Sequence, residues 1–281
     1  MVSGHHADSP SNQAKKSQLM SQSDSSPLDD YWYNDMDFVE REDFLKNTED
    51  IDVVHHIVSH GNNWEKGIIL TNPVVTPSMV DTMIQGSKSW EAREKFARFP
   101  GISEKSQEKL MSHKEDSVLT ALASNPTVPE SRLFELSKFR FTNWSGRRNT
   151  ILIDGAIKNV MDNPNVSDRC FNRIYDEINN HKDMGNSVIN MKIPLMKHPK
   201  TPGNILRSLY ENSHKGHTIQ RPIMNNPNTP QTVYDEIVDN PSNEHVAAEL
   251  ISMERTTPEQ ALRLKNDPSD VVQEAYRKRF G

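Results

Sequence analysis

The sequence contains little of what several common classes of protein require. A single cysteine, Cys170, occurs in 281 residues, so the chain cannot form an internal disulfide. No apolar stretch approaches the roughly 20 residues that a transmembrane helix needs, and no signal-peptide pattern opens the chain. We therefore expect a protein of a reducing, cytoplasmic environment that does not insert into a membrane.

Signatures of catalysis are also missing from the sequence. It has no glycine-rich phosphate loop, no nucleophile elbow and no zinc-finger spacing. His56 and His60 have the one-turn spacing of a metal-binding pair, but no third ligand is evident near them. We therefore expect no catalytic residues, no cofactor and no metal.

What the sequence does contain is a recurring phrase in which Asn-Pro, or a similar pair, is followed shortly by Thr or Ser. The first prolines of successive phrases are separated by 27, 26, 38, 35 and 28 residues: Pro73, Pro100, Pro126, Pro164, Pro199 and Pro227. Near-regular spacing of this kind is typical of stacked structural repeats. Extended in both directions, it predicts eight repeats that begin near residues 47, 73, 100, 126, 164, 199, 227 and 255.

Each half of the phrase has a physical role. Proline ends the preceding helix, and it also pushes the residue before it out of the α region. A following Thr or Ser is predicted to cap the next helix, with a second proline at the first helical position. The predicted Thr-Pro helix starts are at Thr76, Thr201, Thr229 and Thr257, and an acid replaces the proline after Ser103 and Ser167.

Two apolar stripes lie within each repeat. The first follows the cap at helical spacing, as in Val80, Met83 and Ile84, and predicts a helix that we call the A helix. The second directly precedes the next proline, as in Leu122 and Ala123, and predicts a B helix. Turn-forming residues separate A from B. Because such a hairpin cannot bury its own stripe, neighbouring hairpins must stack.

Two segments carry a resemblance to a known family. Residues 90–100 and 118–126 resemble the leucine-rich repeat variant, a HEAT-like or armadillo-like α-solenoid repeat, and the resemblance covers about residues 47–281. It implies an all-α fold, a right-handed α-solenoid of about eight helical-hairpin repeats of roughly 26–38 residues. One branch of the family carries an iron–sulfur cluster, which needs several thiolates, so that function does not extend to this chain.

Composition separates three segments of the chain. Residues 1–30 are rich in serine and predict a disordered tail. Residues 31–46 are acidic and aromatic, and they either cap the open end of the repeats or dock a basic partner. Residues 47–281 form the repeat domain. Only 34% of the chain is hydrophobic and the mean hydropathy is −0.77, which suits an elongated stack.

Charge is distributed unevenly along the chain. Net charge is −6 overall, whereas residues 124–225 contain 15 Lys and Arg against 9 acids, a net charge of +6. The longest A–B connections lie in this basic region, at residues 138–148, 181–182 and 214–221. Equivalent turns of stacked repeats line up along one edge, and basic side chains next to aromatics suit phosphates and stacked bases.

Two functions follow from these patterns. The first is a non-catalytic scaffold or adaptor that binds a protein partner through the surface of the repeats. The alternative is nucleic-acid binding along the basic edge. The residues that this edge would use are Lys138, Arg140, Trp144, Arg147, Arg148, Lys182, Lys215 and Arg221.

Neutralising Lys138, Arg140, Arg147 and Arg148 together should leave the helical signal and the melting temperature nearly unchanged, because exposed loop charges contribute little to stability. It should weaken binding of an acidic ligand. Trp144→Ala separates the two candidate ligands, since loss of a stacked base costs about 1–3 kcal/mol. Full retention of native partners by the quadruple variant would show that this edge is not the contact surface.

Overall fold

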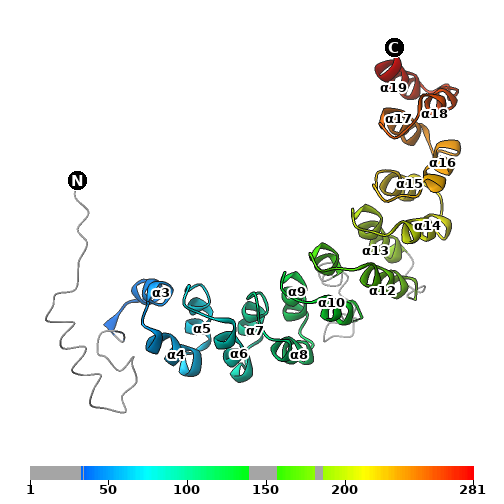
Figure 1. Ribbon diagram of the computed structural model, residues 1–281. Helices are drawn as coiled ribbons and strands as arrows, with labels where there is room; N and C mark the ends of the chain where they lie inside the picture. The colour runs from blue at the N-terminus through cyan, green and yellow to red at the C-terminus, as the bar shows by residue number, and fades with distance from the viewer. Residues whose placement is uncertain (1–32, 34, 139–156, 181–185) are drawn as a thin grey trace, which may run out of the picture. The chain divides into compact units, whose positions relative to one another are not determined.

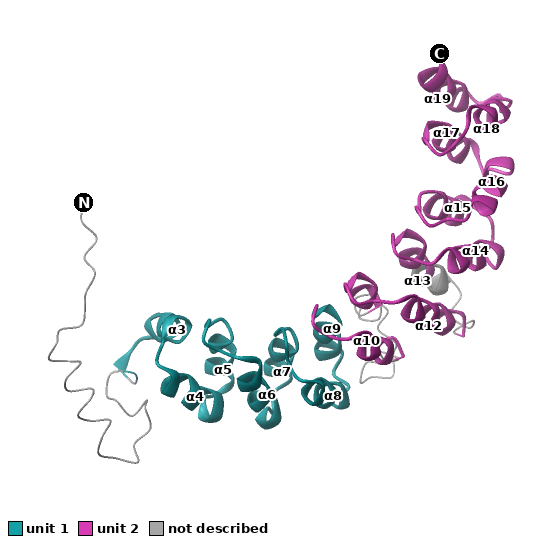
Figure 2. Cartoon of the chain, viewed as in Figure 1, with its two compact units in different colours: residues 1–125 teal, residues 126–281 magenta. Residues whose placement is uncertain are grey.

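The computed structural model describes residues 33, 35–138, 157–180 and 186–281, and all regular structure in these ranges is helical. The all-α prediction is therefore confirmed for the described part of the chain, which contains no strand and no helix with the length and apolarity to cross a membrane. The predicted tail, residues 1–30, lies outside the described ranges. The chain divides into two compact units, residues 1–125 and 126–281 (Figure 2).

Unit 1 contains three hairpins preceded by one additional helix. The helices are α3 (Phe38–Asn47), α4 (Ile51–His60), α5 (Asn63–Ile69), α6 (Pro77–Gly86), α7 (Trp90–Ala97), α8 (Glu104–Ser112) and α9 (Asp116–Ser124). Each of α3, α5 and α7 contacts the next odd-numbered helix, while α4, α6 and α8 form a second row (Figure 1). The first row holds the B helices, and α3 occupies the B position ahead of the first hairpin.

Unit 2 repeats this arrangement of two rows in its described residues. Its helices are α10 (Glu130–Leu136), residues 157–162, α12 (Asp168–Asn179), α13 (Asn186–Lys197), α14 (Gly203–Glu211), α15 (His217–Met224), α16 (Gln231–Asp239), α17 (Glu244–Ser252), α18 (Pro258–Leu264) and α19 (Asp270–Phe280). The B helices α13, α15, α17 and α19 contact one another in order. The A helices α10, α12 and α14 do the same, and α16 contacts α18.

The apolar stripes are buried as the sequence predicts. Val80, Met83 and Ile84 of the A helix α6 lie in the core, and so do Leu122 and Ala123 of the B helix α9. A helix that buries a stripe of this width needs a neighbour on that side. The contacts between successive helices of each row supply that neighbour.

The predicted helix caps are only partly correct. Thr76 and Thr257 cap α6 and α18 through their hydroxyl groups, with proline at the start of each helix. Thr201 and Thr229 do not, because they stand two residues after the first proline of the phrase instead of three. Their hydroxyls are buried and donate to carbonyls six residues earlier, 2.6 Å from the Leu195 oxygen for Thr201, and the second proline takes the cap position. Ser167 does occupy the N-cap position of α12, but its side chain makes no capping hydrogen bond, and its hydroxyl donates to Glu130 instead.

The asparagine of the phrase does more than end a helix. The side-chain nitrogen of Asn72, which is buried, donates to the carbonyl oxygens of Leu45 and Thr48, both at 2.9 Å. Asn125 donates in the same way to Ala97 and Phe99 at the end of α7. We call this pair of hydrogen bonds the asparagine clasp, because it joins the end of one B helix to the end of the preceding one.

The clasp recurs in unit 2. Asn226 donates to the carbonyls of Met196 and His198 at 2.8 and 2.9 Å. At the end of the chain Arg279 takes over the same contacts, and its guanidinium donates to the carbonyls of Ile251, Met253 and Thr256. A buried carbonyl that would otherwise lack a donor is thus satisfied at these junctions.

The described part of the acidic aromatic segment packs onto α5. Tyr33 is buried, and its hydroxyl donates to Glu65 at 3.0 Å while its ring meets Phe44 edge-on. Phe38, the first residue of α3, instead remains exposed. Tyr33 and α3 therefore cover the first hairpin.

Asn72→Ala should destabilise the protein by about 1–3 kcal/mol, the usual cost of leaving a buried hydrogen-bonding group without its partner. Asn63→Ala is the matched control, because Asn63 is exposed on the neighbouring helix α5, and it should change stability by less than about 0.5 kcal/mol. Chemical denaturation followed by circular dichroism measures both. Equal stability of the two variants would contradict the structural role of the clasp.

Candidate partner-binding surface

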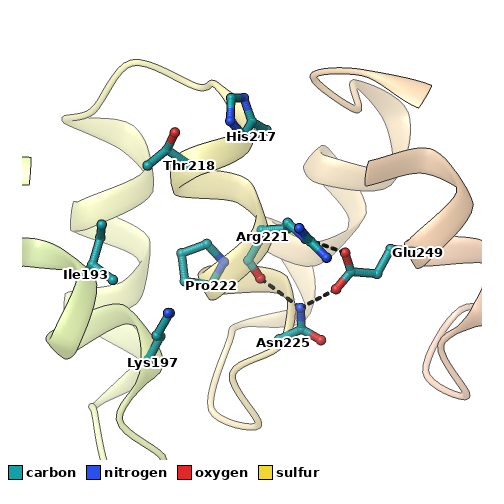
Figure 3. Close-up of a pocket in the computed structure, with 8 residues that line it drawn as sticks. All are labelled: Ile193, Lys197, His217, Thr218, Arg221, Pro222, Asn225 and Glu249. Atoms are coloured by element: carbon teal, nitrogen blue, oxygen red, sulfur yellow. Dashed lines mark hydrogen bonds and ion pairs between the residues drawn. The ribbon is translucent and has the colours of Figure 1, made fainter. Parts of the chain in front are cut away.

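The described surface of unit 2 contains a hollow of about 540 Å³ on the row of B helices. Figure 3 shows its lining, which comes from three successive B helices: Ile193, Lys197, His217, Thr218, Arg221, Pro222, Asn225 and Glu249. Each of these helices belongs to a different hairpin. The hollow therefore exists only because three repeats are stacked.

One wall of the hollow is ordered by a small polar network. Arg221 Nε on α15 lies 2.5 Å from Glu249 Oε2 on α17, and Asn225 Nδ2 donates to the other carboxylate oxygen at 2.8 Å. Asn225 also donates to the Arg221 carbonyl (Figure 3). The Arg221 side chain is 61% exposed and the Glu249 side chain 27%, so the ion pair contributes little to stability, but together with Asn225 it directs the two charged groups toward each other.

The opposite wall is different in character. Lys197 on α13 is exposed and has no ion-pair partner among the described residues. Ile193 and Pro222 supply apolar surface beside it. Pro222 has no amide proton, so the carbonyl of Thr218 on the preceding turn cannot receive its usual helical hydrogen bond. Apolar surface between an unpaired lysine and an ion-paired carboxylate suits a polypeptide segment that has both apolar and charged side chains.

Three of the eight residues predicted for the basic edge lie in the described part of the chain. Lys138 follows α10, pairs with Glu135 at 2.7 Å and lies over the ring of Phe134. Lys215 pairs with Glu236 on α16, and the hydrogen bond to that carboxylate raises the pKa of Lys215. The other five predicted residues lie outside the described ranges: Arg140, Trp144, Arg147, Arg148 and Lys182.

Lys215 and Arg221 are not brought together on one edge. Lys215 contacts an A helix, α16, whereas Arg221 faces the B helix α17. Arg221 was predicted for its basic charge, but Lys197, Asn225 and Glu249 were not predicted at all. The spacing of Arg221 and Asn225, four residues apart on one helix face, was the available signal.

His198 stands at the clasp position of its repeat, directly after α13. Its Nδ1 accepts the amide of Lys200 at 3.2 Å, as the asparagine oxygen does in other repeats, and its Nε2 lies 3.3 Å from Asp162. Phe171 packs against the ring. Burial lowers the pKa of His198, and the nearby Asp162 carboxylate opposes that shift.

The carboxylate that faces His198 has a second partner. Lys158 Nζ lies 2.7 Å from Asp162, and mainly through that hydrogen bond it lowers the pKa of the Asp162 carboxyl. His198 therefore adjoins one anion and two lysines, since Lys200 also lies beside it. Accepting a hydrogen bond at Nδ1 requires the neutral ring, so this junction depends on the protonation of His198.

His56 and His60 stack with ring centroids 4.9 Å apart on α4. No group of three or more potential metal ligands occurs among the described residues. Comparison with known protein families, with curated proteins and with solved structures gave no match to this chain.

The free energy of unfolding should fall as the pH is lowered from about 7 to about 5. His198 has a depressed pKa in the folded state, so the unfolded chain, with a histidine pKa of about 6.5, binds the proton more readily. The neutral His198 ring contributes fully to the free energy of unfolding at pH values above the pKa of histidine in the unfolded chain. That contribution is lost as the pH falls through the lower pKa of His198 in the folded chain. Urea titrations at several pH values measure this.

His198→Asn, which restores the residue of the other clasps, should reduce that pH dependence over the same range. His245→Asn, at an exposed position on α17, is the control and should leave the wild-type profile unchanged. A stability difference between His198→Asn and wild type that did not vary with pH would contradict the role assigned to the imidazole.

Proposed function

We propose that this chain is a right-handed α-solenoid of about eight helical hairpins that acts as a non-catalytic scaffold or adaptor for protein partners. The proposal extends the resemblance to leucine-rich repeat variant and HEAT-like repeats. It is supported by the two rows of helices within each unit and by the recurring clasp that joins successive B helices. A reducing, cytoplasmic location is part of the proposal and rests on the single cysteine.

The observation that carries the binding function is the hollow over α13, α15 and α17. Stacked helices present equivalent side chains side by side, so one partner segment can contact three hairpins at once. The hollow offers both charges, apolar surface and an unpaired lysine, Lys197. Arginine next to apolar surface is typical of the residues that dominate protein interfaces.

A protein partner is favoured over nucleic acid by the state of the three described residues of the predicted basic edge. Lys138, Lys215 and Arg221 each pair with a carboxylate. Binding to a phosphate backbone depends on cations that are free to replace the counterions of that backbone. An ion pair that must first be broken weakens such binding, whereas a protein partner can use both members of the pair.

The test compares two double variants of the full chain purified from its native cells, with and without nuclease. Lys197→Ala with Arg221→Ala should lower partner capture about tenfold or more, if the two side chains together contribute about 1.4 kcal/mol. Lys105→Ala with Arg263→Ala is the matched control, since it removes one exposed lysine and one exposed arginine that pairs with Asp239. The control should bind as wild type.

Nuclease treatment should not change the captured protein. Capture that nuclease abolishes, together with retention on heparin that falls steeply with salt, would support the nucleic-acid alternative. Equal capture by both double variants would show that the hollow is not the contact surface.

A further inference from the structure

Three aromatic residues mark the starts of neighbouring B helices in unit 1. Phe38 is the first residue of α3, Trp64 the second of α5 and Trp90 the first of α7, at a spacing of 26 residues in both steps. Helix α3 contacts α5, and α5 contacts α7. We call these three residues the aromatic strip.

Phe38 and Trp90 of the strip are exposed, and Trp64 is half-buried. Phe38 is 62% exposed and Trp90 is 49% exposed, and the rings of Phe38 and Trp64 pack 4.6 Å apart. Covering the end of the repeats does not explain this exposure, because the buried Tyr33, which packs against the half-buried Phe44, performs that role. Exposed large aromatics in a row are typical of a contact surface.

Carboxylates without ion pairs surround the strip. Among the described residues none of the following forms an ion pair: Asp35, Asp37, Glu40, Glu65 and Glu91. The hydrogen bond from Ser89 lowers the pKa of Glu91, and Arg93 is near enough to lower it further. Asp37, Glu40 and Glu65 cap helix starts, but their hydrogen bonds are to backbone amides and to the Tyr33 hydroxyl, which leaves the negative charge in place.

The local charge balance is negative. The stretches 35–40, 62–66 and 88–92 contain these five acids and two lysines, Lys66 and Lys88, a net charge of −3. The wider stretch 35–100, which includes all three helices of the strip, holds twelve acids and seven bases, a net charge of −5. A nucleic acid or an anionic membrane would be repelled from this surface.

We propose that the aromatic strip binds a segment of a partner protein rich in arginine and lysine. A guanidinium or ammonium group is attracted to the face of tryptophan, and nearby carboxylates add to that attraction. Adjacent helices lie about 8–10 Å apart, and side chains on the same side of an extended segment recur about every 6.6–6.8 Å. Long, flexible arginine and lysine side chains can span the remaining difference. The inference shares the partner-binding role of the proposed function but concerns a different surface in a different unit.

The test uses a labelled peptide of alternating arginine and serine, twelve residues long, at physiological salt. Its binding to the full chain is followed by fluorescence anisotropy, and the tryptophan emission is recorded at the same time. The citrulline version of the peptide has the same shape without the charge. It should bind at least about tenfold more weakly.

Phe38→Ala with Trp90→Ala should weaken binding of the arginine peptide roughly fivefold or more, since each exposed cation–π contact contributes a few-fold. Glu40→Gln with Glu91→Gln should weaken it in the same direction while keeping the oxygens that accept the local hydrogen bonds. Leu262→Ala, at an exposed apolar position on α18, is the control and should bind as wild type. Melting temperatures verify that each variant is folded.

Several outcomes would overturn the inference. One is equal binding of the citrulline peptide, and another is unchanged binding by Phe38→Ala with Trp90→Ala. Self-association of the chain that this variant abolishes would assign the strip to a second copy instead. Lys197→Ala with Arg221→Ala should leave peptide binding intact, so failure at the strip and failure at the hollow are distinguishable.

Discussion

The carboxamide of one buried asparagine at each clasp holds two backbone carbonyls of the preceding repeat, and the stacking of the B helices depends on this contact. Proline after the asparagine stops the helix, so the last carbonyls of the helix have no donor within their own segment. Burial between neighbouring helices removes water as an alternative partner. A side chain with two donors on one nitrogen meets that need, and its oxygen accepts the amide two residues ahead, as in Asn72 and Asn226.

Other side chains contact the helix end at junctions that lack the asparagine, so the need for a hydrogen-bond partner there is general. Arg279 reaches three of the carbonyls at the end of the last described junction. His198 keeps the acceptor half of the arrangement through Nδ1 and directs Nε2 toward a carboxylate. The Arg279 contact is independent of pH because arginine stays charged, whereas the His198 contact depends on a neutral imidazole.

Regular stacking also creates the surfaces. Equivalent positions on successive B helices lie side by side, so a hollow over three helices and a strip of aromatics over three others arise from the same geometry. Ion pairs follow the same spacing: Lys215 reaches Glu236 across 21 residues, and Arg221 reaches Glu249 across 28. Such pairing offsets the charges of Lys215 and Arg221, whereas Lys197 and the carboxylates near Phe38 and Trp90 form no ion pair among the described residues.

The sequence by itself determined the helical class, the positions of the hairpins and the buried stripes, because helix stops, caps and apolar spacing act within one repeat. It predicted Thr201 and Thr229 as caps incorrectly, since a phrase shorter by one residue turns the hydroxyl inward. It identified Arg221 by charge but not Lys197 or Glu249. Only the tertiary structure decided which side chains of different repeats meet, because contacts such as the clasp and the hollow join residues about one repeat apart.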